Sequence, residues 1–261
     1  MGLAPRVARV HVVLVEPKYE GNVGAVARAM KNFGARDLRL VRPCAIGEDA
    51  RRRAMHGGDV LDAAKTYRTY AAAIRGMDLV VGTSGVDTAS EKKFLRIALA
   101  PRDLAVKLAA LDGDAALVLG REDFGLLNEE LKPCDALVTI PASPEYPILN
   151  VAQAAAVLLY EIHAAKPPAE ARGRRMASAM ERDLLHDAFA DVLAVTHYPE
   201  HKQGRTQVMF RRLVARAEPT TWEYHAFMGV LTRAAKTIRR ERALRGKQTA
   251  PRTRGTAKGR S

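Results

Sequence analysis

The spacing of apolar positions in the first two thirds of the chain predicts strands that alternate with helices. Short apolar or alternating runs, typical of strands, occur at 9–16, 38–41, 79–81, 116–119 and 136–140. Helical spacing or helix-start signals occur at 22–34, 66–74, 128–131 and from Pro101 onward, while 47–58 fits either a helix or a loop. This alternation predicts an α/β fold, a mostly parallel sheet with helices on both faces.

The segment 149–165 is apolar around nearly its whole circumference. Its apolar positions are Val151, Ala152, Ala155, Ala156, Leu158, Leu159 and Ile162. Such a helix is buried on more than one side. Two interpretations stay open: a helix of the core, or one shared between the core and a homodimer interface. We prefer the second, because the predicted sheet is too small to cover the whole helix.

Beyond residue 165 the pattern changes, and four regions result. Residues 1–165 form the α/β domain, and 166–171, with Lys166-Pro167-Pro168, form a linker. Residues 172–238 form a helical extension, with amphipathic helices around 184–193, 207–217 and 221–238. Residues 239–261 are basic and contain nothing apolar enough to pack, so we expect a disordered tail.

The positive charge is concentrated in the C-terminal third. The formal net charge is +13, of which residues 1–165 carry +1 and residues 166–261 carry +12. This polarity suits a polyanion such as nucleic acid. A basic tail that serves only solubility is the alternative.

The composition argues against several other classes. No apolar run approaches the roughly 20 residues of a membrane helix, and the N-terminus does not resemble a signal peptide, so we expect a cytoplasmic protein without a membrane partner. Cys44 and Cys134 have no His or Cys neighbours at metal-binding spacing. We therefore expect free, at least half-buried thiols and no metal.

Three segments that follow predicted strands carry the candidate chemistry. The first, EGNVGAVARAM, contains Asn22, which we expect to cap the helix, and Arg28, which lies about 200° from Val26 and therefore off the apolar face. The second, GRED, begins at Gly120, where a missing side chain would let a ligand approach the backbone. The third, IPASPEYPILN, is too rich in proline to be a helix or inner strand and ends at Asn150, a helix cap.

Familiar cofactor and hydrolase motifs are missing. The turn after the first strand is GNVG rather than GxGxxG, and the second strand ends without an acidic ribose ligand. The chain also lacks GxxxxGK[ST], HExxH and GxSxG. On residues alone, the GRED segment remains either an ordinary turn or part of a ligand crevice.

Taken together and in this order, EGNVGAVARAM, LVLGREDFGLLNEEL and IPASPEYPILNVAQA resemble the motifs of SPOUT methyltransferases. The likeness is to the SpoU/TrmH-like branch, and within it to the TrmJ-type tRNA 2′-O-methyltransferases. It covers residues 8–165 well and the helical extension more loosely. The resemblance implies a C-terminal trefoil knot, an obligate homodimer, and S-adenosylmethionine bound at the knot, with S-adenosylhomocysteine as the product.

The resemblance also implies roles for individual residues. Glu122 and Asn150 would support the cofactor loop, and Asn22 and Arg28 would be catalytic. The residues that would line the cofactor are Thr83, Ser84, Gly85, Gly120, Ile140, Pro147, Ile148 and Leu149. Bacterial relatives often have serines after the Glu-Tyr pair, whereas this chain has Pro147-Ile148, so a contact there is apolar or through the backbone.

The activity implied is 2′-O-methylation of tRNA. The expected target is cytidine, and also uridine, at nucleotide 32, the first of the anticodon loop. Because arginine stays protonated, Arg28 would hold the neighbouring phosphate and stabilise the developing alkoxide rather than act as a base. Two alternatives remain: a ribosomal RNA 2′-O-methyltransferase of the same branch, and a non-catalytic RNA-binding protein on the same fold.

Overall fold

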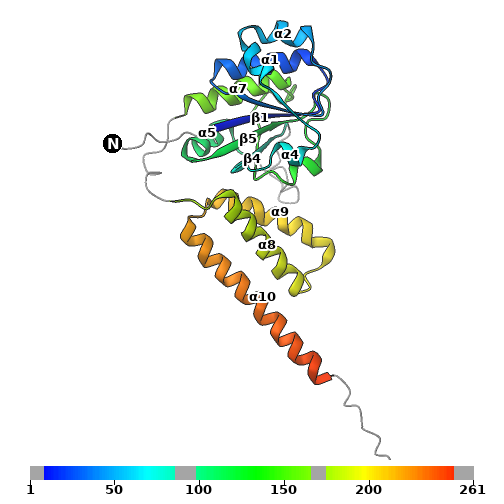
Figure 1. Ribbon diagram of the computed structural model, residues 1–261, viewed down its shortest axis with the longest axis vertical. Coiled ribbons are helices and arrows are strands. Elements are labelled where there is room, and N and C mark those ends of the chain that lie inside the picture. The colour runs from blue at the N-terminus through cyan, green and yellow to red at the C-terminus, as the bar shows by residue number, and fades with distance from the viewer. Residues whose placement is uncertain (1–8, 86–97, 166–174, 250–261) are drawn as a thin grey trace, which may run out of the picture.

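A parallel six-stranded sheet forms the centre of the first domain (Figure 1). The computed structural model describes residues 9–85, 98–165 and 175–249, with the backbone alone for 245–249. The strand order is β3-β2-β1-β5-β4-β6. The strands are β1 (Arg9–Val15), β2 (Asp37–Val41), β3 (Lys65–Tyr67), β4 (Leu79–Thr83), β5 (Asp114–Leu119) and β6 (Ala136–Val138).

Helices cover both faces of this sheet because alternate residues of the inner strands are apolar on both sides. On one face, Val12 and Leu14 of β1 pack with α1 (Glu20–Asn32), α5 (Pro101–Ala110) and α7 (Val151–Ala164). On the other, Val13 and Val15 pack toward α4 (Tyr70–Ala73) and α6 (Asn128–Leu131). Shorter elements beside α1 are α2 (Glu48–Ala54), η1 (Met55–Gly57) and α3 (Gly58–Asp62).

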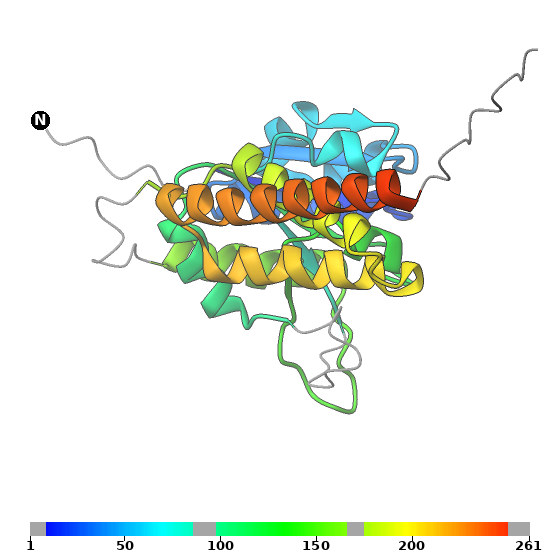
Figure 2. The ribbon, with the colours of Figure 1, turned by 90° about the horizontal axis from the view of Figure 1, so that it is seen from below.

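Three helices make up the described part of the extension, residues 175–249, which lies below the sheet domain in Figure 1 and faces the viewer in Figure 2. They are α8 (Ala179–Val195), α9 (Glu200–Ala217) and α10 (Thr221–Thr249). The extension has its own small core, in which the rings of Phe189 and Phe210 stack with centroids 3.9 Å apart. Its hydrophobic residues follow the helical spacing predicted from the sequence.

Polar contacts attach the extension to the sheet domain. Lys107 of α5 donates to the carbonyl oxygen of Ala215 at 2.7 Å and pairs with Glu218. Arg212 of α9 donates to the carbonyl oxygen of Leu131 at 3.1 Å, and its neighbour Arg211 pairs with Asp135 at 3.3 Å. Two arginines of α9 thus provide a hydrogen bond and an ion pair to oxygen atoms at the α6–β6 end of the sheet domain.

The predicted class is confirmed: an α/β fold with a mostly parallel sheet, helices on both faces and a helical extension. The 47–58 segment is largely helical. Both cysteines are free, with Cys134 buried and Cys44 half-buried, as expected. Burial raises the pKa of the Cys134 thiol to about 12. The trefoil knot stays a prediction.

Two sequence predictions about secondary structure were wrong. The expected helix at 66–74 is instead the edge strand β3, where Thr66 pairs with Leu40, followed by the single turn α4 capped by Thr69. Thr66 and Tyr67 favour strands, and pairing with β2 decides the outcome. The expected disorder from Arg239 is also contradicted, because α10 continues to Thr249. Residues 166–171, the predicted linker, and 250–261 of the predicted tail lie outside the described residues.

The described residues contain neither a membrane-spanning helix nor a cluster of metal ligands. None of the helices there combines the length and apolarity needed to cross a bilayer. Nor do three or more His, Cys, Asp or Glu side chains gather as a metal site within that part of the chain.

The Arg211–Asp135 pair yields a stability prediction. Asp135 is buried, and this burial raises the pKa of its carboxyl group. Arg211→Ala leaves the Asp135 carboxylate without its ion-pair partner, so we expect the free energy of unfolding at pH 8 to fall by about 2–4 kcal/mol. The deficit should shrink as the pH falls through the folded-state pKa of Asp135, because the protonated acid needs no cation.

Urea unfolding at a series of pH values from 8 downward measures this difference. The double variant Arg211→Ala/Asp135→Asn is the control and should recover part of the loss, since it removes the unpaired charge. A deficit that stays constant over the whole series would show that Asp135 is not the group that Arg211 compensates.

Candidate active site

The candidate site lies at the carboxyl edge of the sheet, where the loops after β1, β4, β5 and β6 emerge. Because all strands are parallel, these loops leave from the same edge. β1 has β2 on one side and β5 on the other, so the chain proceeds outward in both directions from the β1–β5 pair. Such a reversal of strand order opens a crevice in which α/β proteins bind ligands.

A chain of side-chain hydrogen bonds joins the three sequence motifs at this edge. Asn22 Nδ2 donates to Glu122 Oε1 at 3.0 Å. Asn150 Nδ2 donates to Asn22 Oδ1 at 3.1 Å. Each residue comes from a different motif. Along the chain, Glu122 lies 100 positions and Asn150 lies 128 positions after Asn22. The structure therefore brings together Asn22, Glu122 and Asn150, while the roles that the resemblance implies for them stay predictions.

Glu122 also holds the entry to α1. Its carboxylate accepts the backbone N–H of Lys18 at 2.9 Å and that of Tyr19 at 3.3 Å. An ionised carboxylate only accepts hydrogen bonds, so it fixes the amide of Asn22 with its NH₂ toward Glu122 and its oxygen toward Asn150. Lys18 and Tyr19 were not among the predicted site residues, because backbone donors leave no sequence signal.

The predicted cap at Asn22 was wrong, whereas the one at Asn150 is confirmed. The N-cap of α1 is Tyr19, without a side-chain cap, and Asn22 lies in the first helical turn. Its amide is thereby available for the links to Glu122 and Asn150. Asn150 does cap α7, accepting the N–H of Ala152 at 2.8 Å, while Gln153 accepts the N–H of Asn150 at 3.3 Å.

Gly120 begins a tight turn whose geometry differs from our expectation. Arg121 and Gly125 exchange backbone hydrogen bonds of 3.1 and 2.9 Å. A methyl group on Gly120 would overlap the carbonyl carbon of Gly125. The space beside Gly120 is therefore filled by the chain itself, and the idea that it is left open for a ligand was wrong at this atom. Glycine is required for the turn.

A buried ion pair fixes the rest of that turn. Arg121 donates to both carboxylate oxygens of Glu130, at 2.9 and 2.8 Å, and to Glu16 at 2.7 Å. The hydrogen bond from Arg121 lowers the pKa of Glu16, and the one to Glu130 raises the pKa of Arg121. Bidentate pairs of this kind are strong and directional. Sequence reasoning missed these residues as a unit, although Glu16 and Arg121 follow buried strands and Glu130 lies in the acidic first turn of α6.

Apart from Gly120, the predicted cofactor-lining residues fall on two segments that meet. Thr83 ends β4, Ser84 and Gly85 follow it, and the N–H of Ser84 donates to the carbonyl oxygen of Val138 of β6 at 3.0 Å. A Cβ on Gly85 would lie 2.7 Å from Ile148 Cδ1, so the two loops are in contact there. The other predicted residues of the second segment are Ile140 and Leu149, half-buried, and Pro147, exposed.

Arg28 lies apart from the hydrogen-bond chain. Its side chain is exposed and forms no ion pair with another described residue. On an ideal helix it is about 120° around from Asn22 and about 9 Å farther along the axis. Its backbone is closely packed, since a Cβ on Gly57 would be 2.9 Å from Arg28 Cα. The guanidinium is thus presented to solvent from a firmly held helix.

The motifs that meet at this edge are those of a known family. The sequence model of the SpoU rRNA Methylase family matches residues 9–160. The chain belongs to the SpoU rRNA Methylase family. The matched span contains the whole six-stranded sheet and all three motifs. The predicted family is confirmed, and with it that the protein is an enzyme of methyl transfer; methylation in this family depends on S-adenosylmethionine.

Individual relatives match over most of their length. The tRNA (cytidine-2′-O-)-methyltransferase TrmJ of Methanocaldococcus jannaschii is 41% identical over 80% of this chain and 92% of its own. The tRNA (cytidine/uridine/adenosine-2′-O-)-methyltransferase TrmJ of Pseudomonas aeruginosa is 34% identical over 88% and 95%. Among solved structures, TrmJ from Z. mobilis superposes with a TM-score of 0.67, at 25% identity, covering 86% of this chain and 98% of its own.

The turn at Gly120 yields a second prediction. Gly120→Ala should destabilise the protein by more than about 2 kcal/mol, because the methyl group meets backbone that cannot move aside without breaking the turn. Gly58→Ala is the matched control: Gly58 begins α3 with φ −58°, and no other described residue comes within 4 Å of the position that a Cβ would occupy there. That change should be neutral or stabilising by up to about 1 kcal/mol.

Thermal unfolding of the two variants beside the unmodified protein measures the contrast. An unfolding temperature for Gly120→Ala equal to that of Gly58→Ala would contradict the close approach of Gly120 and Gly125.

Proposed function

We propose that the protein transfers a methyl group from S-adenosylmethionine to a ribose 2′-hydroxyl of tRNA. The observation that carries the proposal is the Glu122–Asn22–Asn150 chain, which assembles all three family motifs at the crevice edge of the sheet. The relatives named for tRNA 2′-O-methylation support the choice of substrate, since they match this chain beyond the family domain and into the extension.

The residues present fit S-adenosylmethionine. Gly85 and Ile148 are in contact and, with Ile140 and Leu149, offer an apolar wall for an adenine ring. The segment 141–148 is exposed and not in a helix or strand, so much of its backbone is available to hydrogen-bond a flat polar ring. When bound, the cofactor supplies an electrophilic methyl group on a positively charged sulfur.

The residues of this chain would orient the ribose and stabilise charge. A 2′-hydroxyl loses its proton as it attacks, so negative charge develops on its oxygen. Arg28, exposed and without an ion-pair partner among the described residues, is suited to hold the adjacent phosphate and that developing alkoxide. Asn22, held by Glu122 and Asn150, would orient the ribose. The proton would pass to the substrate phosphate or to a transient neighbour.

We propose cytidine as the target, with uridine as a second, at nucleotide 32 of tRNA, and a cytoplasmic location. Ribosomal RNA is the second candidate substrate, favoured by the name of the family model. The matched extension favours tRNA, because the relatives named for tRNA share most of this chain's length. A binding protein without catalysis is disfavoured by the intact motif chain.

We also propose a homodimer formed through the outer face of α7. Ala155, Leu158 and Leu159 of α7 are buried in the core, whereas Val157 and Tyr160 are 37% and 55% exposed. Val157→Glu should therefore leave the fold intact and split the dimer, because it adds charge to an apolar interface. Phe227→Glu, an equally apolar exposed site on α10, is the control. Light scattering that finds a monomer before any substitution would refute the dimer.

The activity is tested by mapping 2′-O-methyl nucleotides in a tRNA transcript incubated with the protein and S-adenosylmethionine. We expect methylation at nucleotide 32. Arg28→Ala should lower its rate by about 10²–10³, with unchanged unfolding temperature and cofactor affinity, because one charged stabiliser is lost at an exposed position. Arg36→Ala, another exposed arginine without an ion pair in the described chain, should methylate normally.

Near-normal turnover by Arg28→Ala would overturn the role of that arginine alone. Methylation of ribosomal RNA and not of tRNA would instead replace the proposed substrate.

A further inference from the structure

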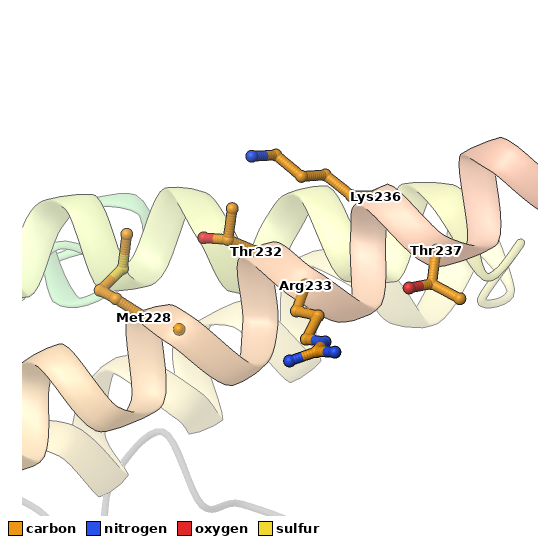
Figure 3. A pocket seen from close by; sticks show the side chains of 6 residues that line it. Met228, Thr232, Arg233, Lys236 and Thr237 are labelled. Atoms are coloured by element: carbon orange, nitrogen blue, oxygen red, sulfur yellow. The ribbon is translucent and has the colours of Figure 1, made fainter.

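Six residues of α10 line an open groove along one side of the helix (Figure 3). They form two rows with a four-residue spacing: Met228, Thr232 and Lys236, and Gly229, Arg233 and Thr237, of which all but the half-buried Met228 are exposed. The hollow between them has a volume of about 450 Å³. In Figure 3, Thr232 and Lys236 point to one side of the helix and Arg233 and Thr237 to the other.

The groove is positively charged on both sides. Arg233 and Lys236 are exposed, and neither forms an ion pair with any residue in the described part of the chain. α10 as a whole contains seven lysines and arginines against two glutamates. Arg239, three residues after Lys236, differs from these two because it forms an ion pair with Asp191 of α8. Two cations therefore flank the hollow, and among the described residues no carboxylate pairs with either.

Gly229 leaves its position in the second row without a side chain. It lies in the interior of α10, and no atom of the described residues is within 4 Å of the position that a Cβ would occupy, the helix's own nearby backbone aside. Glycine inside a helix costs about 1 kcal/mol relative to alanine, and neither a turn nor a close intramolecular contact requires it here. A glycine of this kind allows another chain to approach the helix backbone closely.

An exposed aromatic residue continues the same face. Trp222 is 76% exposed and lies two helical turns, about 10 Å, before Gly229. It is the only tryptophan in the sequence. A solvent-exposed indole on a basic surface is suited to stack on a nucleobase.

We propose that this groove binds one ribose-phosphate strand of the RNA substrate, with phosphates between Arg233 and Lys236 over Gly229 and a base stacked on Trp222. The inference rests on the proposed function and deepens it, naming the surface of the extension that holds RNA. The occupant is RNA rather than a protein because the groove offers two cations without ion-pair partners in the described chain and two threonine hydroxyls, with the exposed indole of Trp222 beyond it on the same face.

Trp222 fluorescence tests the site directly. Titration of the full chain with an unmodified tRNA transcript should quench this emission and saturate. Gly229→Ala should raise the half-quenching concentration about fivefold or more, since a methyl group keeps the phosphates away from the backbone and weakens charge-assisted hydrogen bonds. Gly204→Ala, an equally open glycine inside α9, should leave it unchanged. Both substitutions should preserve or raise the unfolding temperature.

A second pair of variants tests whether the charge of the groove contributes to RNA binding. Lys236→Gln should reduce the slope of log affinity against log salt by about one unit, as expected for one lost phosphate contact. Lys202→Gln removes an exposed lysine of α9 that forms no ion pair with another described residue, and it should leave the slope unchanged. Inorganic polyphosphate should compete for the groove without quenching Trp222, because it has no bases.

The outcomes separate this inference from the proposed function. Loss of affinity in Gly229→Ala, with nucleotide mapping still showing methylation at saturating tRNA, supports the groove. Unchanged quenching in Gly229→Ala and an unchanged salt slope in Lys236→Gln, in a protein that methylates tRNA, overturn the groove alone. A change in oligomeric state on Gly229→Ala without a change in RNA affinity would assign the groove to protein contact and also overturn it.

Discussion

The carboxylate of Glu122 is the contact on which the arrangement of the candidate site depends. It accepts two backbone N–H groups before α1 and the amide of Asn22, which in turn accepts from Asn150. Three segments that are distant in sequence therefore share one hydrogen-bonded frame. Glu122 itself need not touch a substrate for its loss to matter, because the amide of Asn22 would then be oriented only by the hydrogen bond that it accepts from Asn150.

A second set of contacts fixes the turn that carries Glu122. Gly120 allows the chain to fold back on Gly125, and Arg121 then reaches Glu130 and Glu16. The side chains of Arg121 and Glu130 are buried. Removing either one would leave the other as an unpaired buried charge, which would lower the stability of the fold. Contacts within the turn therefore fix the position of Glu122, and through it those of Asn22 and Asn150, before any ligand binds.

Much of the fold was predictable because it depends on local patterns. The inner strands and α1, α5 and α7 have apolar residues at the spacing that their burial demands, and Asn150 caps where a cap was expected. The errors arose where partners decide the structure. Thr66 and Tyr67 become a strand only because β2 lies beside them, and Asn22 is a link rather than a cap because Glu122 is within reach. The Gly120–Gly125 approach leaves no periodic signal in the sequence.

The division of charge between the two domains fits the RNA-binding role that we propose for the extension. The sheet domain is almost neutral, so most of the net positive charge that would attract RNA at long range lies in residues 166–261. Some of that positive charge serves docking, since Arg211 and Arg212 of α9 face the sheet domain. α10 lies on the other side of the extension and keeps Arg233 and Lys236 exposed. One helix therefore attaches the extension to the catalytic fold while another presents its cations to solvent, which separates anchoring from RNA attraction.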